Sequence, residues 1–374
     1  MFKTPKAPFR QVTHSPVMQR EIDKVELTDD GKTVWSLEAW RGLAAWMVVY
    51  AHYRPFVSPD VSLLSFSFTG VDLFFVLSGF VFAPYLFGRP LFLREFATRR
   101  FFRIYPAYFL ALGIYVSLKA LSSEELPYIW QHLLFAHLQT REMAFFYNPA
   151  FWSLPAEVEF YLLLPLLAIF TRGRIGRFAV LVVGALLMRM ALGYASDSPN
   201  ENRAYVWMYH LPGLLMEFML GGVAWLISRR LKNWKGKALL LVLGLVGWLV
   251  LAGVFVKLGD KGIDATWARG QISWLAALAF AAMVAATARL PEQVPYLIRF
   301  ISVWAGRLSY GTYLLHFAAL QFVRQHVPAM APLTTALLAC ALTLAASWLM
   351  YRLWENPWRE FGRAPVRRQP VAPV

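Results

Sequence analysis

The chain has 374 residues, of which 58% are hydrophobic and only 16% are charged. An ordinary soluble domain is about 25% charged, so this composition excludes a disordered chain and argues against a soluble fold. The formal net charge of +15 would suit a protein that binds nucleic acid. Because the cytoplasmic loops of membrane proteins also collect Lys and Arg, we attribute the charge to membrane topology and predict no nucleic-acid partner.

Ten apolar stretches follow a polar, basic amino-terminal segment. That segment, residues 1–34, lacks the apolar core of a cleaved signal peptide and is predicted to be a cytoplasmic tail. Each stretch is about long enough to cross a bilayer as a helix, and together they cover residues 37–57, 64–87, 101–121, 150–170, 176–195, 204–228, 238–256, 267–288, 301–323 and 333–354. The sequence therefore predicts an all-α, polytopic membrane protein, with a membrane domain over residues 35–357 and a basic cytoplasmic tail over residues 358–374.

The distribution of positive charge predicts the orientation of this protein. Most of the 37 Lys and Arg residues lie in every second connection, on the same side as the amino terminus. By the positive-inside rule, both termini are then cytoplasmic. The longest connection on the other side, residues 122–149, contains an apolar stretch at 130–138, which we expect to lie in the membrane interface as an amphipathic helix. The single cysteine, Cys340, excludes an intramolecular disulfide, and we predict no metal site.

Two residues of the first apolar stretch are candidates for function, because ionisable groups inside a membrane are costly. Arg41 and His52 are eleven residues apart, which places them on one helix face with about 16 Å between them along the axis. Arg41 is expected near the cytoplasmic edge and His52 near the middle of the membrane. The structural alternatives are an arginine that snorkels to the interface and a histidine hydrogen-bonded within the bundle.

The third and fourth stretches carry further polar groups with helical spacing. Arg100 and Arg103 share a face at the cytoplasmic mouth, where guanidinium groups can bind phosphates in a bidentate manner; a plain topology signal is the alternative. In the fourth stretch, one face carries Ser153, Glu157 and Tyr161 at i, i+4 and i+8. Glu159 lies about 200° from Glu157 around the helix, so we do not expect these two carboxylates to form an acid–base pair.

Height estimates place four polar residues near the middle of the membrane. With a hydrocarbon core of about 30 Å and a helix rise of 1.5 Å per residue, the heights of His52, Asp72, Glu157 and His316 are about 14–22 Å from the inner edge. A histidine is a natural general base for a hydroxyl group, and a nearby carboxylate can orient it. An arginine-lined entrance below would hold a phosphorylated carrier, such as one that delivers an acyl thioester.

These residues fall within a set of motifs that occur in a fixed order. The sequence resembles the bacterial membrane-bound acyltransferase family 3, whose members O-acylate surface glycans and other acceptors. The resemblance is carried by LEAWRGLAA at 37–45, His52, GVDLFFVLSGF at 70–80, the RxxR run at 100–103, WSL at 152–154 with Glu157, SYGTYLLH at 309–316 and ENP at 355–357. Glu38 stands where the family more often has Asp, and no departure removes a proposed catalytic group.

The resemblance implies an O-acyltransferase, most often an O-acetyltransferase, in the bacterial inner membrane. Acetyl-CoA would be the co-substrate, without a permanently bound cofactor. The resemblance further implies that His52 is catalytic, that Glu157 is an active-site carboxylate, and that Arg41, Arg100 and Arg103 bind acyl-CoA.

The remaining expectations concern secondary residues and partners. Asp72 is a lesser candidate for orienting His52, and Ser153, Tyr161 and His316 are expected as polar residues of the interior. The expected partners are membrane lipids, acyl-CoA and a glycan or lipid-linked glycan acceptor, with the oligomeric state left open. The alternative function is a transporter or flippase for an anionic or lipid-linked substrate, and the purely structural alternative is a scaffold whose buried charges only pair with one another.

Overall fold

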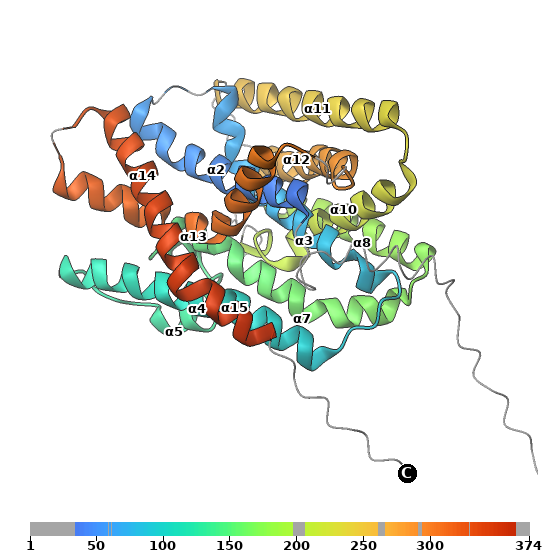
Figure 1. Cartoon of the computed structure of the whole chain (residues 1–374), viewed down its shortest axis with the longest axis horizontal. Coiled ribbons are helices and arrows are strands. Elements are labelled where there is room, and N and C mark those ends of the chain that lie inside the picture. The colour runs from blue at the N-terminus through green and yellow to red at the C-terminus, as the bar shows by residue number, and fades with distance from the viewer. Residues whose placement is uncertain are drawn as a thin grey trace, which may run out of the picture.

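The computed structural model describes residues 34–363, except 59, 61, 197–205, 261–265, 291–293 and 329. Throughout this part of the chain, all regular secondary structure is helical, as Figure 1 shows. The two expected tails fall mostly outside the described residues. The last helix, however, continues to Arg363, beyond the expected end of the membrane domain at residue 357.

Each of the ten apolar stretches overlaps one long helix of the described chain, although the stretches 64–87, 150–170, 204–228, 267–288 and 333–354 extend beyond the ends of theirs. These helices are α2 (Trp35–Val57), α3 (Gly70–Leu86), α4 (Leu93–Leu121), α7 (Ser153–Thr171), α8 (Ile175–Ser196), α10 (Leu211–Arg230), α11 (Trp234–Asp260), α12 (Thr266–Thr287), α13 (Tyr296–His326) and α14 (Pro332–Met350). Short elements connect them: η1 (Leu63–Thr69), α5 (Ile129–Leu133), α6 (Arg141–Phe145), η2 (Pro149–Trp152), the π-helical turn η3 (Tyr351–Glu355) and α15 (Asn356–Arg363).

Seven helical segments of the described chain are long and apolar enough to cross a membrane. Among the ten long helices, α2, α12 and α13 are not among these seven segments. The helix α2 carries Glu38 and Arg41, and α13 carries Arg299 and Arg307, so their charges lower the mean hydropathy. Of α12, the part whose side chains the structure describes, Gln271–Thr287, is an apolar helix.

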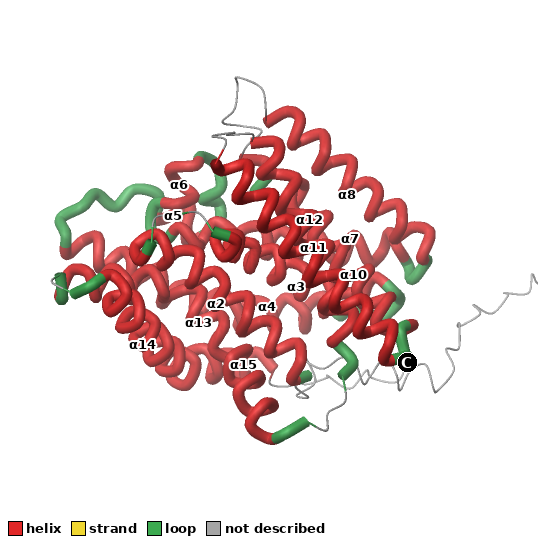
Figure 2. Tube along the Cα trace, turned by 90° about the horizontal axis from the view of Figure 1, so that it is seen from above, coloured by secondary structure: helices red, strands yellow, loops and turns green. Residues whose placement is uncertain are grey.

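The helices differ strongly in how much of their surface other helices cover. In the most apolar stretches, 78% of the η1–α3 residues and 72% of the α10 residues are buried, but only 11% of those of α11. The helix α3 packs along α10, and the backbones approach closely because Gly79 faces Phe218 and Gly221 faces Val76. Figure 2 shows α3 between α14 on one side and α8 on the other. The covered helices α3 and α10 therefore form the interior, and α11 presents its leucines and valines outwards.

A second tight helix pair fixes the position of the first candidate residues. The helix α2 packs along α13, where Gly42 meets Ala305 and Gly306 meets Glu38. A side chain at either glycine would overlap the facing helix, so small residues are needed at both positions. This pairing places Arg41 and His52, which lie on α2, beside α13.

The connection at residues 122–149 differs from the expected interfacial helix. The expected helix at 130–138 is instead the single short helix α5, followed by a reversal at Phe135 with φ 54°. His132 and His137 are fully buried, whereas Trp130 is 74% exposed. The segment therefore folds back onto the bundle and covers the beginning of α7.

Candidate active site

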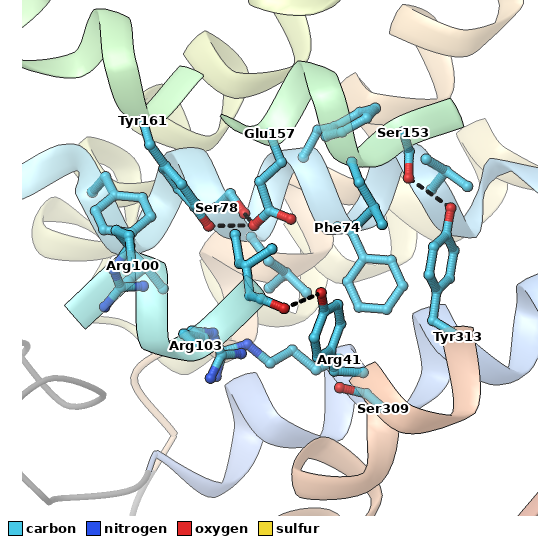
Figure 3. Close-up of a pocket in the computed structure, with 18 residues that line it drawn as sticks. Arg41, Phe74, Ser78, Arg100, Arg103, Ser153, Glu157, Tyr161, Ser309 and Tyr313 are labelled. Atoms are coloured by element: carbon cyan, nitrogen blue, oxygen red, sulfur yellow. Dashed lines mark hydrogen bonds between the residues drawn. The ribbon is translucent and has the colours of Figure 1, made fainter. Parts of the chain in front are cut away.

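A cavity of about 80 Å³ lies between α2, α3, α4, α7 and α13. Figure 3 shows its residues, which come from parts of the chain far apart in sequence. Its polar side chains are Arg41, Ser78, Arg100, Arg103, Ser153, Glu157, Tyr161, Ser309, Tyr310 and Tyr313. Six residues predicted from the sequence thus line one cavity: Arg41, Arg100, Arg103, Ser153, Glu157 and Tyr161.

The three arginines of the cavity have different surroundings. The Nη1 atom of Arg41 donates to Glu38 at 2.7 Å. The guanidinium of Arg100 lies 5.0 Å from the ring centre of Phe82, in a cation–π contact. Arg103 has no hydrogen bond or ion pair with any residue in the described part of the chain.

Arg103 is nevertheless surrounded by negative charge. The carboxylates that act on it electrostatically belong to Glu355, Glu38 and Glu157. Two of these carboxylates have arginine partners of their own, since Glu38 binds Arg41 and Glu355 accepts from Nη1 of Arg359 at 3.3 Å. The guanidinium of Arg103 therefore retains its hydrogen-bond donors for an anionic ligand in the cavity.

Glu157 is held at the cavity wall by two hydroxyl groups. Its Oε1 atom accepts a hydrogen bond from Tyr161 and another from Ser78 at 3.3 Å. Tyr161 follows Glu157 by one helical turn, as the i, i+4 spacing predicted, whereas Ser78 comes from α3. Figure 3 shows that these contacts leave the other carboxylate oxygen, Oε2, beside the cavity.

Ser153 and Tyr313 close the opposite end of the cavity from Arg100, as Figure 3 shows. The Tyr313 hydroxyl donates to the carbonyl oxygen of Ala150 at 2.6 Å. Since that proton is used, Ser153 is the donor in its 2.6 Å hydrogen bond with Tyr313. The Tyr313 side chain is only 4% exposed, so both its ring and its hydroxyl are fixed.

His52 and His316 form a hydrogen-bonded pair beyond Tyr313. Their Nδ1 and Nε2 atoms, respectively, are 3.1 Å apart. Nδ1 of His316 contacts the carbonyl oxygens of Thr312 and Tyr313 at 3.2 and 2.9 Å, so this nitrogen carries a proton. Nε2 of neutral His316 then accepts the proton of His52 Nδ1, which leaves Nε2 of His52 with a free lone pair.

The histidine pair changes one expectation about how His52 is oriented. The sequence suggested a carboxylate, Glu157 or Asp72, for this role. The structure instead gives His52 a histidine partner that two backbone carbonyl groups hold in one tautomer. The Tyr313 ring, whose centre is 6.3 Å from that of His316, links this pair to the cavity.

Asp72 lies in a different cluster, away from the cavity. It is 5% exposed, and its charged neighbours are Glu217 and Arg189. Arg189 donates to the Gly213 carbonyl at 2.5 Å and lies 3.8 Å from Glu217. The cluster joins α3, α8 and α10, so the contacts of Asp72 are those of a buried ionic group within the bundle.

Glu159 faces away from Glu157, as the helical spacing indicated. Its Oε1 atom lies 2.6 Å from Nδ1 of His210, and its Oε2 atom accepts from the Leu211 backbone at 2.7 Å. Nε2 of His210 lies 2.8 Å from the Leu138 carbonyl oxygen. The hydrogen bond with Glu159 is the largest influence on His210 and raises its pKa. Glu159 thus anchors the start of α10 to α7.

His132 and His137 form a stacked pair in the connection before α7. Their ring centres are 4.1 Å apart and their planes differ by 4°. Each ring binds one carbonyl oxygen, of Tyr128 and Phe151 respectively. Nε2 of His132 and Nδ1 of His137 are buried without a hydrogen-bond partner. Burial lowers the pKa of His132 to about 4 and that of His137 to about 3, below the ordinary value of 6.5.

We expect acid to loosen this connection. Between about pH 6.5 and 4, the histidines bind protons in the unfolded segment but not in the folded one. As the pH decreases through this range, the free energy of unfolding of the segment therefore falls by about 1.4 kcal/mol per pH unit for each histidine. Hydrogen exchange of residues 128–151, corrected for the intrinsic pH dependence, should show weaker protection at pH 5 than at pH 7. The helix α11 serves as the internal control. Equal protection of 128–151 at both pH values would contradict the prediction.

Several site residues were missed by the sequence reasoning. Ser78 and Tyr313 lie within recognised motifs, but only the fold shows that their hydroxyl groups contact Glu157 and Ser153. Glu217 and Arg189 were detectable as charges within apolar stretches. No cluster of three metal-ligating side chains occurs among the residues that the structure describes, and the absence of a metal site stays a prediction.

Comparison with known proteins places these residues in a family. The sequence profile of an acyltransferase domain matches residues 34–352. The O-acetyltransferase OatA of Staphylococcus aureus (strain NCTC 8325 / PS 47) is 24% identical over 335 residues, which cover 80% of this chain and 54% of that protein. A protein of S. aureus (strain COL), provisionally named an O-acetyltransferase, is 24% identical over 339 residues, covering 82% of this chain and 55% of its own length.

The chain therefore spans about half the length of the curated relatives it matches. No solved structure matches it significantly. The acyltransferase profile covers most of the sequence, including the whole cavity and the histidine pair. With its multiple apolar helices, this chain is a multi-pass membrane protein that belongs to the acyltransferase family defined by that domain.

Proposed function

We propose that this protein is an O-acetyltransferase of the bacterial inner membrane. It takes an acetyl group from cytoplasmic acetyl-CoA and transfers it to a hydroxyl of an exported or cell-surface glycan. The observation that carries the proposal is Arg103, which lines the same cavity as Glu157 and has no hydrogen bond or ion pair with the residues that the structure describes. Membership of the acyltransferase family and the names of the relatives support the reaction class.

The proposal includes a topology of ten membrane spans. In it, α2, α12 and α13 also cross the membrane, and both termini lie in the cytoplasm. The two charges of α2 that lower its hydropathy, Glu38 and Arg41, form an ion pair with each other. This topology places Arg100 and Arg103 at the cytoplasmic end of the cavity and the histidine pair towards the outer side.

The acyl end of the donor then enters the cavity from the arginine side. Its phosphates bind at the arginine end, because guanidinium groups make charge-assisted hydrogen bonds to phosphate oxygens. The thioester carbonyl reaches the Tyr313 end, and the histidine pair, which does not line the cavity, lies beyond the Tyr313 ring. Glu157 balances the charge of the arginines when the donor is absent.

The transfer step uses the free lone pair of His52. The acceptor oxygen attacks the thioester carbonyl carbon while its proton passes to Nε2 of His52. The carbon–sulfur bond then breaks, the new ester leaves with the acceptor, and the CoA thiolate takes the proton from the imidazolium. A covalent acyl-histidine intermediate is the alternative course of the same reaction.

The purified protein in lipid nanodiscs, supplied with acetyl-labelled acetyl-CoA and a panel of bacterial glycans, tests this function. We expect release of free CoA together with label in an alkali-labile ester of one glycan, and no repeated turnover when the glycan is omitted. The opposing result is counterflow of an anionic or lipid-linked substrate across proteoliposomes without CoA release. That result would replace the enzyme with a transporter or flippase.

A further inference from the structure

Two aromatic rings close the cavity at the end away from Arg100. Phe74 of α3 and Tyr313 of α13 both line it, and their rings meet edge to face with centres 5.8 Å apart and planes at 79°. Figure 3 shows Phe74 between Glu157 and Tyr313. Val71 and Leu154 add apolar surface to the lining. This end of the cavity is therefore suited to an apolar group, in contrast to the cationic end.

The wall formed by Phe74 and Tyr313 is held in place. Tyr313 is tied by its hydroxyl to the Ala150 carbonyl and to Ser153, each at 2.6 Å, so its ring cannot swing aside without breaking two hydrogen bonds. Phe74 packs against that ring. Interiors packed in this way resist the insertion of even one extra methylene group.

The size of the cavity limits what can lie against this wall. A water molecule needs roughly 10–15 Å³ of such space, so the 80 Å³ of the cavity accommodates about six small groups. The thioester end of acetyl-CoA, comprising methyl, carbonyl carbon and oxygen, sulfur and two methylenes, is of that size. A longer acyl chain has to displace one of the two rings.

We propose that Phe74 and Tyr313 set the length of the transferred acyl group and restrict the donor to acetyl-CoA and similarly short acyl-CoAs. This inference rests on the proposed function, since it concerns the donor of that reaction. The methyl group lies against the two rings, and the rest of the donor extends out of the cavity past the arginine end. Each additional methylene group that the site can bury raises the affinity for the donor about fourfold. Butyryl-CoA has two more methylene groups than acetyl-CoA, so a smaller side chain at the wall should raise the preference for butyryl-CoA by about an order of magnitude.

A competition assay measures this selectivity. Wild-type protein, Phe74→Leu and Tyr313→Leu are each given equal concentrations of acetyl-CoA and butyryl-CoA with the glycan acceptor, and the two esters are counted by mass spectrometry. The butyryl-to-acetyl ratio does not depend on how much of a variant has folded. We expect wild-type protein to form almost only the acetyl ester and each variant to raise the ratio about tenfold or more.

A matched control and a second variant make the outcome decisive. Phe80→Leu trims a buried phenylalanine of the same helix that does not line the cavity, and its ratio should equal that of wild-type protein. If Phe74→Leu and Tyr313→Leu are inactive, the same ratio is measured for the milder variant Val71→Ala, which enlarges the same end of the cavity. An unchanged ratio in the active wall variants, or a wild-type protein that transfers butyryl as readily as acetyl, would overturn the inference. Absence of transfer from every acyl-CoA by wild-type protein would instead refute the proposed function.

Discussion

Replacing His52 with Gln should lower glycan-dependent acetyl transfer about 100-fold or more, because a positioned general base contributes roughly 10²–10⁴-fold. The tautomer imposed by His316 leaves Nε2 of His52 as the proton acceptor, and a glutamine amide cannot take its place. The measurement is kcat for transfer of labelled acetyl to the glycan. His326→Gln is the control, because His326 is exposed at the end of α13 and contacts Phe322.

The protein level and the thermal stability of His52→Gln should match those of wild-type protein. Full activity in this variant would remove His52 from the mechanism. A labelled acetyl group trapped on His52 of wild-type protein in the absence of glycan would assign the covalent course instead of general base catalysis. The two courses differ in this readout although both require His52.

The residues of α7 show what local periodicity can predict. Ser153, Glu157 and Tyr161 were placed on one face by their spacing, and all three line the cavity. The same helical geometry placed Glu159 on a different face of α7 from Glu157, and Glu159 binds His210 there. Residues within a few turns of one helix have a relative position that the helix geometry alone determines, so no knowledge of the neighbouring helices was needed.

Asp72 shows where that reasoning stops. Its estimated height was near those of His52 and Glu157, but it contacts Glu217 and Arg189 on the other side of α3. Height follows from the helix rise, whereas the direction in which a residue faces depends on which surface of the helix is covered. On α3, the close approach of Gly79 to Phe218 determines which surface of the helix α10 covers. This contact joins residues that are far apart in the sequence. His52 and His316 had similar estimated heights, and here the pairing of α2 with α13 brings them together.

The connection at 122–149 illustrates a different limit. Its apolar stretch reads equally well as an interfacial helix or as a segment buried against the bundle, since both bury apolar side chains. The structure buries His132 and His137 beneath Tyr147 and Tyr108. Two neutral histidines that bind backbone carbonyl groups are compatible with such burial. The composition of the segment alone does not distinguish this buried arrangement from an interfacial helix.

Arg103→Ala should raise the KM for acetyl-CoA at least tenfold. A hydrogen bond to a charged group contributes about 1.5–3 kcal/mol, which corresponds to roughly 10–100-fold in affinity. We expect kcat to change much less, because Arg103 lies at the end of the cavity away from the histidine pair. Arg103→Lys should recover only part of the loss, since an ammonium group keeps the charge but not the bidentate geometry.

Arg99→Ala is the matched control for Arg103→Ala. Arg99 lies on the same helix, forms an ion pair with Glu95 at 3.8 Å and does not line the cavity. Raising the salt concentration should weaken donor binding more in wild-type protein than in Arg103→Ala, because screening acts on the charge that the variant lacks. An unchanged KM in Arg103→Ala would show that the donor phosphates bind elsewhere. Because the carboxylates of Glu38 and Glu355 each have another arginine partner, removal of Arg103 leaves neither of them without a counter-ion, and a rise in KM therefore reports donor binding.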